Sequence, residues 1–368
     1  MSYEVDIRAV GEESKSGDAI VLRYGDFSHR GGFKVVVIDG GFMESGEDLV
    51  KHIREFYNAG DVVDLVISTH PDSDHVNGLK GVLEELEVRE LWMHRPWNRA
   101  AVVNEYVQHG SASNRTLSEK LKRSLDGAWE LDKIARRKNI PIVEPFAGTE
   151  SGDSVLAVLG PSEDYYNSLV AEYGDSEQAS ARRSVFEQIA AGARKAAKWV
   201  VETWDKDELV EPEDDAVSPQ NNSSVVLLAH LDDTFFLFTA DAGVPSLTQA
   251  ADYAESREFS IAANVKFMQG GHHGSKRNIG PTLLNRIVGP IVGENERTGN
   301  WTFISAAKKG EPKHPSSRVI NAHIRRGSEV GVTQGQSHCY KSADVPSRPN
   351  WGPITPRVFV RQYEEEEG

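Results

Sequence analysis

Residues 62–86 carry the feature that most restricts what this chain can fold into: an apolar strand, a polar loop and a helix in direct succession. The β-branched run Val62–Ile67 is typical of a buried strand, and Gly78–Leu86 spaces its apolar residues as a helix does. The loop between them holds four side chains that can bind a metal ion, His70, Asp72, Asp74 and His75. Because α/β folds place ligands at the carboxyl ends of strands, we predict a metal site in this loop.

Strands and helices alternate along most of the chain, which predicts an α/β or layered α/β/α fold. Two charged, helical stretches interrupt this order at about residues 98–139 and 162–216, and we expect them to be insertions that cover one side of a β-rich body. In the second stretch one helical stripe is apolar, with Val185, Ile189, Ala193, Ala196 and Val200. We therefore expect a single domain over residues 1–360, followed by an acidic, solvated tail at 361–368.

The composition is that of an ordinary globular protein, with 39% hydrophobic and 26% charged residues. No apolar run approaches the roughly 20 residues needed to cross a bilayer, and the chain opens as a strand rather than as a leader. We therefore expect a cytoplasmic protein with no membrane partner. The single Cys339 excludes a thiolate zinc knuckle, so imidazole and carboxylate groups must hold any metal. The net charge of −15 works against non-specific binding to a phosphate backbone.

Polar residues suited to metal binding follow five separate predicted strands. They are Asp39, the His70–His75 cluster, Asp241, the pair His272 and His273, and His314. A divalent ion is best held by groups that arrive from different elements, and imidazole with carboxylate favours zinc, manganese or iron. Two ions about 3.5–4 Å apart would share a bridging carboxylate and a nucleophilic hydroxide. We predict that Asp241 is this bridge and that Asp39 orients a ligand without binding metal itself.

Taken in order along the chain, these segments resemble the motifs of the metallo-β-lactamase superfamily, and in particular those of the soluble hydrolase domain of ComEC-type competence proteins. The matching segments are Gly17–Ile20, Val37–Gly41, Thr69–His75 with the pattern His-x-Asp-x-Asp-His, Asn221–Ser224 as a strand start, Thr239–Asp241, His272–Ser275 and Ser305–Pro315. The resemblance covers residues 1 to about 96 and 140 to 340 discontinuously. It implies a four-layer αββα sandwich with two divalent metal ions, zinc or manganese, at one edge between two sheets.

The resemblance also assigns residues to the two metals. One metal would take His70 and Asp72, and the other would take Asp74, His75 and His273, with Asp241 between them. His273 is preferred over its neighbour because the superfamily ligand usually directly precedes a Gly. His272 and Ser275 are then expected beside the ligands rather than among them.

Three positions depart from the broader superfamily pattern. Asp72 stands where most members have His, and Asn222 stands where a third His is expected. An oxygen-rich site favours manganese or magnesium more than a three-His site does, while zinc stays open. Ala240 replaces the usual Gly of the Thr-Gly-Asp motif, a change that can shift the turn.

The leading functional hypothesis is a metal-dependent hydrolase, a phosphodiesterase or nuclease that acts through a metal-bound hydroxide. Asp74 belongs to the catalytic centre, and His314 is expected to contact the substrate phosphate or donate a proton, although a His before a Pro also suits a helix start. The ComEC-type resemblance implies DNA or a nucleotide as substrate. Two other hypotheses stay open: hydrolysis of a small ester, lactone or amide, and a module whose helical insertions bind a protein partner beside a weakened metal site.

Overall fold

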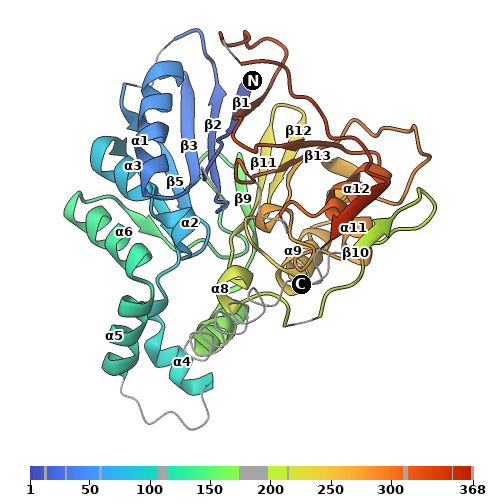
Figure 1. Cartoon of the computed structure of the whole chain (residues 1–368). Helices are drawn as coiled ribbons and strands as arrows, with labels where there is room; N and C mark the ends of the chain where they lie inside the picture. Colours follow the sequence, from blue (N-terminus) through green and yellow to red (C-terminus); the bar gives the residue numbers. More distant parts are fainter. Residues whose placement is uncertain are drawn as a thin grey trace.

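Two large β-sheets face each other, and helices cover both outer faces (Figure 1). The structure is a computed structural model, and it describes residues 1–11, 15–29, 31–57, 60–106, 114–173, 198–213, 215–309, 314–349 and 351–365. The layers follow the order helix, sheet, sheet, helix. The layered α/β fold predicted from the sequence is therefore confirmed.

The first sheet has seven strands in the order β16-β1-β2-β3-β5-β7-β8. Their bounds are β1 Ser2–Ile7, β2 Ala19–Gly25, β3 Phe33–Gly40, β5 Leu65–Ser68, β7 Leu91–Met93, β8 Ile142–Val143 and β16 His338–Lys341. β1 and β2 form an antiparallel hairpin, whereas β3, β5, β7 and β8 run parallel. The carboxyl ends of these parallel strands share one edge, which brings the end of β3 beside the loop that follows β5.

The second sheet has six strands in the order β15-β14-β13-β12-β11-β9. Their bounds are β9 Leu156–Gly160, β11 Val226–Leu231, β12 Thr234–Phe238, β13 Val265–Gln269, β14 Trp301–Ile304 and β15 Glu329–Val332. β12 to β15 are parallel, so the segments that follow β12, β13 and β14 also leave from one edge. Asp39, the His70–His75 cluster, Asp241 and the pair His272 and His273 thus lie at the carboxyl ends of parallel strands, whereas His314 follows the end of β14 by ten residues.

The main core lies between the sheets, because alternate side chains of each strand point inward. Ile20 and Leu22 of β2 pack in this inner core with Phe236 and Phe267 of the second sheet. Val21, between them in sequence, packs instead against the outer helices. Each sheet is therefore buried on both faces, which explains the almost continuous apolar runs in the sequence.

Helices cover the outer face of each sheet. On the first sheet they are α1 Met43–His52, which continues as a π-helical turn at Ile53–Tyr57, α3 Leu79–Glu85 and α6 Asp126–Arg137. On the second sheet they are α9 Val244–Ser256, α11 Pro281–Ile287 and α12 Ser317–Arg325. Shorter helices are α2 Ser73–Val76, α8 Pro219–Asn222 and α10 Ile261–Asn264. None of the helices described in the structure has the length and apolar character that a membrane crossing requires.

The described residues of the stretch predicted as the first insertion, about 98–139, are largely helical. The helical elements include a 3₁₀ turn at Pro96–Asn98, α4 Ala100–Tyr106, α5 Asn114–Ser124 and α6. Figure 1 shows α4 and α5 extending away from the two sheets, while α6 lies closer to them. α6 contacts both α2 and α3, so the insertion is joined to the loop that carries the metal-capable residues.

The second insertion differs from the prediction. Residues 163–173 are helical, but Val200 lies in a strand, β10 Lys198–Val201, and the other residues of the predicted stripe lie outside the described residues. β10 pairs antiparallel with β17 Gln362–Glu365. Residues 362–365 of the expected acidic tail thus form a strand, in which Tyr363 is buried and Glu364 is exposed, and residues 366–368 lie outside the described residues.

The strand predicted at Val62–Ile67 is divided in the structure at Asp64, into β4 Val62–Val63 and β5. A second short strand, β6 Glu87–Val88, precedes β7 in the chain. The Asp64 carboxylate accepts a hydrogen bond from the Val35 backbone N–H at 2.9 Å and pairs with Arg89 at 2.6 Å. β4 and β6 then pair with each other outside the main sheet.

Candidate metal centre

Asp39 holds His70 and His75, in the loop after β5, through hydrogen bonds on the side of each ring away from Asp241. Its Oδ1 accepts the Thr69 backbone N–H at 2.9 Å, and its Oδ2 accepts the Thr69 hydroxyl at 2.6 Å and Nδ1–H of His75 at 2.8 Å. Because the Thr69 hydroxyl proton goes to Asp39, the Thr69 oxygen is left to accept Nδ1–H of His70 at 3.0 Å. Both imidazoles are thereby held in the tautomer that leaves Nε2 with a lone pair, as metal ligation requires.

Asp241 places its two carboxylate oxygens toward two different groups of side chains. Oδ1 lies 3.4 Å from Nε2 of His75. Oδ2 lies 3.8 Å from Nε2 of His70 and 3.7 Å from Nε2 of His272. Asp241 follows β12, so residues from different strands of the two sheets converge on one buried carboxylate.

The remaining predicted ligands complete the two groups. Asp72 Oδ2 lies 3.9 Å from Nε2 of His70, and Asp74 Oδ2 lies 4.0 Å from Nε2 of His75 and 3.4 Å from Nε2 of His273. Asp72 has the most open side chain of the set, 40% exposed. The structure thus brings all six residues predicted to hold metal into one cluster, while their division between two metals stays a prediction.

The donor set fits divalent ions. Four buried atoms have no hydrogen-bond partner among the described residues: Nε2 of His70, His75 and His273, and Oδ1 of Asp241. Leaving such atoms without partners costs about 1–3 kcal/mol each, and a cation among them would satisfy them together. Ligand atoms about 2.0–2.2 Å from a tetrahedral ion are separated by about 3.4 Å, which is within the range of distances found here.

The protonation equilibria of the histidines reflect the crowding of charge. Burial and the neighbouring His75 lower the pKa of His70 to about 4, so His70 is neutral at pH 7. Burial opposes the charged form of His273, but the carboxylates of Asp241 and Asp74 raise its pKa to about 9. Burial likewise disfavours the charge on Asp241, yet His272, His75 and His273 hold its pKa well below the usual range. Metal binding to such a set releases protons from the histidines.

His272 lies closer to the centre than the sequence predicts. Its Nε2 is as near to Asp241 Oδ2 as that of His70, and its Nδ1 is 3.1 Å from the side-chain amide of Asn221. The sequence places His272 beside the ligands, whereas the structure places it in the His70 group. Its ring also stacks on His314 at a centroid distance of 6.1 Å, which puts His314 at the edge of the centre.

Asn222 and Ser275 lie near the centre but point elsewhere. The Asn222 amide accepts hydrogen bonds from the Gly243 N–H at 3.2 Å and from the Ser246 hydroxyl at 3.0 Å, so it supports the loop after Asp241. Ser275 Oγ accepts the Arg277 N–H at 3.2 Å. The strand start predicted at 221–224 is wrong, since Asn222 ends the short helix α8 and β11 begins at Val226.

Two buried residues at the centre were missed from the sequence. Asp18 shares a potential metal-binding group with His75 and Asp241, and its Oδ2 accepts the Gln269 amide at 2.7 Å. Burial raises the pKa of Asp18. Asn278 donates to the Asp241 backbone carbonyl at 2.8 Å. The Gly17–Ile20 motif was a signal for Asp18, but no local pattern marks Asn278.

The backbone is strained around the centre. Four non-glycine residues there have positive φ, namely Asp39 at 55°, Ala240 at 44°, His272 at 45° and His273 at 55°. Such conformations cost of order 1–2 kcal/mol each for residues with a Cβ. Ala240 stands where the superfamily motif has Gly, so the left-handed turn is kept despite the added methyl group.

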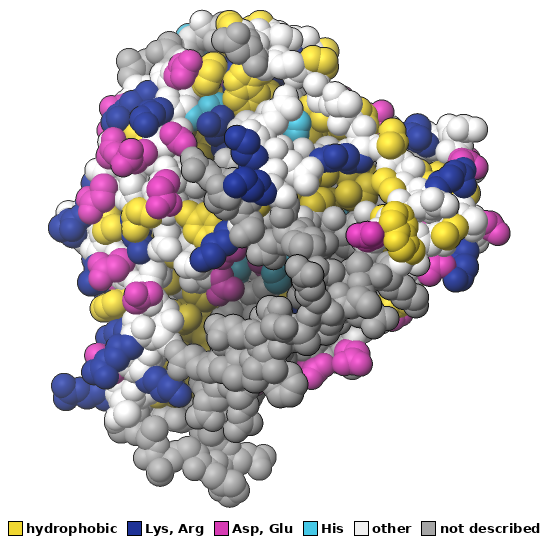
Figure 2. All heavy atoms as spheres, viewed as in Figure 1, with side chains coloured by type: hydrophobic (Ala, Val, Ile, Leu, Met, Phe, Trp, Pro, Cys, Tyr) yellow, Lys and Arg dark blue, Asp and Glu magenta, His cyan; other side chains and the backbone are white. Residues whose placement is uncertain are grey.

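A cavity of about 260 Å³ opens beside the centre. It is lined by Lys15, Ser16, Phe42, Ser73, Asp74, His272, His273 and His314. Figure 2 shows His and acidic side chains together near the middle of this face of the molecule. Among the described residues, the cavity therefore joins the metal-capable cluster to one cation, two hydroxyls and one aromatic ring.

Comparison with known proteins gives one family match. Residues 30–101 match the family described as "Metallo-beta-lactamase superfamily". No curated protein sequence matches the chain. The match extends to the superfamily and not to its ComEC-type members, so that finer resemblance stays a prediction.

Two solved structures are among those that show some similarity to this chain. A Thermotoga maritima protein described as a candidate metallo-beta-lactamase is 12% identical, with a TM-score of 0.31 over 66% of this chain and 79% of its own. A CmlA beta-hydroxylase mutant is 12% identical, with a TM-score of 0.42 over 92% of this chain and 54% of its own. At these scores we draw no conclusion from either protein. Residues 30–101 thus resemble the metallo-β-lactamase superfamily, whose members are generally metal-dependent hydrolases or related enzymes, and the two facing sheets and the His and Asp cluster at their edge agree with this resemblance.

Proposed function

We propose that this protein is a metal-dependent phosphodiesterase. The observation that supports this most is Asp241, whose two oxygens face two separate groups of imidazole and carboxylate ligands. This arrangement suits a pair of divalent ions, manganese or zinc, and paired ions are typical of phosphatases and nucleases. When bound, such ions polarise a phosphoryl oxygen and lower the pKa of water so that it can act as a nucleophile at neutral pH.

The residues around the ligands position them and keep their lone pairs available. Asp39 and Thr69 fix the ring orientation of His70 and His75 through the hydrogen bonds described above. Asn278 holds the backbone of Asp241 at its carbonyl oxygen. His70, Asp72 and His272 would hold one ion, while Asp74, His75 and His273 would hold the other, with Asp241 shared.

The cavity beside the centre suits a phosphodiester. Lys15 is the single Lys or Arg among the described residues that line it, and it would contact a non-bridging phosphate oxygen. Phe42, half-buried at the amino end of α1, would lie against an apolar or aromatic substituent of the diester. His314, stacked on His272, would donate a proton to the leaving oxygen.

Hydrolysis assays test this proposal. Chelator-treated protein is restored with manganese or zinc and given bis-p-nitrophenyl phosphate, single-stranded DNA or p-nitrophenyl acetate. We expect metal-dependent cleavage of both phosphodiesters. Asp241→Asn should abolish it, whereas Asp64→Asn, which changes a carboxylate in the first sheet that binds Val35 N–H and Arg89, should not. Cleavage of the acetate ester alone, or diester cleavage that survives Asp241→Asn, would refute the proposal.

A further inference from the structure

Helix α5 presents two faces of opposite character. Leu121, and Leu125 just beyond the helix, are buried with Trp97 in the core that covers the first sheet, and Leu117 packs against the same core. Arg115, Lys120 and Arg123 lie on the other face and are exposed. Helical periodicity alone separates the two sets, since residues four apart share a face.

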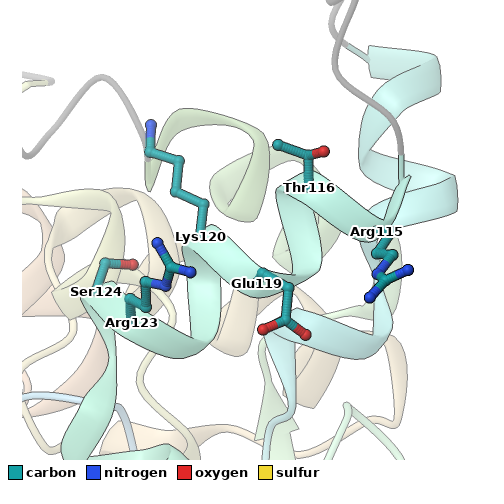
Figure 3. Close-up of a pocket in the computed structure, with 6 residues that line it drawn as sticks. All are labelled: Arg115, Thr116, Glu119, Lys120, Arg123 and Ser124. Atoms are coloured by element: carbon teal, nitrogen blue, oxygen red, sulfur yellow. The ribbon is translucent and has the colours of Figure 1, made fainter.

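The exposed face of α5 borders a hollow of about 570 Å³. The described residues that line it all come from this helix: Arg115, Thr116, Glu119, Lys120, Arg123 and Ser124 (Figure 3). Arg115 lies near one end of the row and Arg123 near the other, so positive charge runs along the helix. Figure 2 shows Lys and Arg side chains gathered over this part of the molecule.

Arg115, Lys120 and Arg123 differ in their ion pairing from other Lys and Arg residues of the first insertion. On α6, Lys133 pairs with Glu130, Arg136 with Asp132, and Arg137 with Glu84 of α3. On α5, Lys122 pairs with Glu119 at 3.1 Å and so neutralises the one acid among the described residues that line the hollow. Within the described part of the chain, Arg115, Lys120 and Arg123 form no ion pair. On a protein of net charge −15, three uncompensated cations in one hollow need a physical explanation.

The hollow is joined to the metal centre through α6. Gly127, three residues beyond the end of α5, lies against Asn77 and Val76, directly after the predicted ligand His75. α5 has 11 residues and is about 16 Å long at 1.5 Å per residue. Because α6 contacts both α2 and α5, α5 is one helix removed from the loop that carries the predicted ligands.

We propose that α5 binds the sugar–phosphate backbone of a single-stranded nucleic acid, so that the substrate is a polynucleotide rather than a free nucleotide. The inference rests on the proposed phosphodiesterase function. Phosphates are bound by Lys and Arg that displace counterions, and the described lining residues include no aromatic side chain that would read bases. The cavity of about 260 Å³ at the metal centre is small for a base pair, which favours a single strand.

Binding of a labelled oligothymidylate of about twenty nucleotides tests the inference, measured by fluorescence anisotropy with the full chain and a chelator present. Three substitutions on α5, Arg115→Gln, Lys120→Gln and Arg123→Gln, should together weaken binding at least tenfold. At about 0.7 per phosphate contact, they should also reduce the slope of log K against log salt by about 2. The matched control neutralises Lys133, Arg136 and Arg137, which removes the same charge from the same insertion and should leave affinity within about twofold.

Each outcome bears on a separate claim. Equal binding by the α5 variant and the unmodified protein would overturn the inference, as would equal weakening by the control. Competition by polyglutamate as strong as that by the strand would also overturn it, because the surface would then suit an acidic protein. The unmodified protein could bind the strand, and the α5 variant fail to bind it, while neither cleaves any diester. That result would uphold the inference and refute the proposed function. An Arg115→Lys and Arg123→Lys variant should keep binding.

Discussion

Asp39→Asn tests whether the carboxylate behind the histidines controls metal affinity. The structure sets the cost of this change. Oδ1 of Asp39 accepts one hydrogen bond and Oδ2 accepts two, all from donors on Thr69 and His75. An amide that keeps its oxygen at the Oδ2 position loses only the bond to the Thr69 N–H, and the opposite orientation loses two. The better orientation should therefore lower the free energy of unfolding by about 1–3 kcal/mol.

The same substitution should also weaken metal binding. It removes the negative charge that raises the basicity of His75 directly and of His70 through Thr69. Losses of this kind typically reduce metal affinity 10–100-fold, or about 1.4–2.8 kcal/mol. Asn tolerates the φ of 55° at this position as well as Asp does, so the backbone need not change.

Titration of the chelator-treated protein with manganese or zinc, followed by calorimetry, measures the affinity, and urea unfolding measures the stability. Asp64→Asn is the control, because Asp64 also accepts a backbone N–H in the first sheet but contacts none of the predicted ligands. It should lower stability and leave metal affinity unchanged. Metal affinity of Asp39→Asn within about twofold of the unmodified protein would show that Asp39 does not act through the histidines.

Three further changes have defined outcomes. Lys15→Gln should raise KM for bis-p-nitrophenyl phosphate about tenfold with a smaller change in kcat, and Lys15→Arg should restore KM. Burial lowers the pKa of His94 to about 3 from its ordinary 6.5. Below pH 6.5 the unfolded chain therefore binds a proton at His94 that the folded chain does not bind, and this lowers the stability of the folded chain. Urea unfolding measures the free energy of unfolding of His94→Phe and of the unmodified protein. Between pH 7.5 and pH 5.5 the difference between these two free energies should change by about 1.4 kcal/mol in favour of the variant. A difference that stays constant with pH would contradict this. Arg325→Met leaves the buried Glu202 carboxylate without its cation and should cost about 3–5 kcal/mol. Adding Glu202→Gln should recover only part of this loss, because Arg325 also donates to three backbone carbonyl groups.

The strands and the local ligand cluster could be predicted because their signals lie within a few residues. The apolar runs mark strands buried on both faces, and His70, Asp72, Asp74 and His75 occupy one loop. The convergence of Asp241 and His273 on that loop could be predicted from the order of the motifs, since parallel strands bring their carboxyl ends to one edge.

Features that depend on distant partners could not be predicted. Val200 fits a helical stripe in sequence, but it lies in a strand because β17, some 160 residues later, pairs with it. Asp18 reaches its place through Gln269, 251 residues away. His272 and His273 are adjacent and chemically identical, and the left-handed backbone at both residues decides where each ring points.

The pairing of β10 with β17 has a consequence for how the chain is made. Glu202 follows β10 and is wholly buried, and its carboxylate accepts the Tyr363 hydroxyl of β17 at 2.6 Å. At about 5–20 residues per second, the ribosome needs on the order of ten seconds or more to synthesise the intervening residues. During that time β10 exposes an unpaired edge, and the nascent protein depends on Arg325 and Tyr363 arriving before that edge meets another chain.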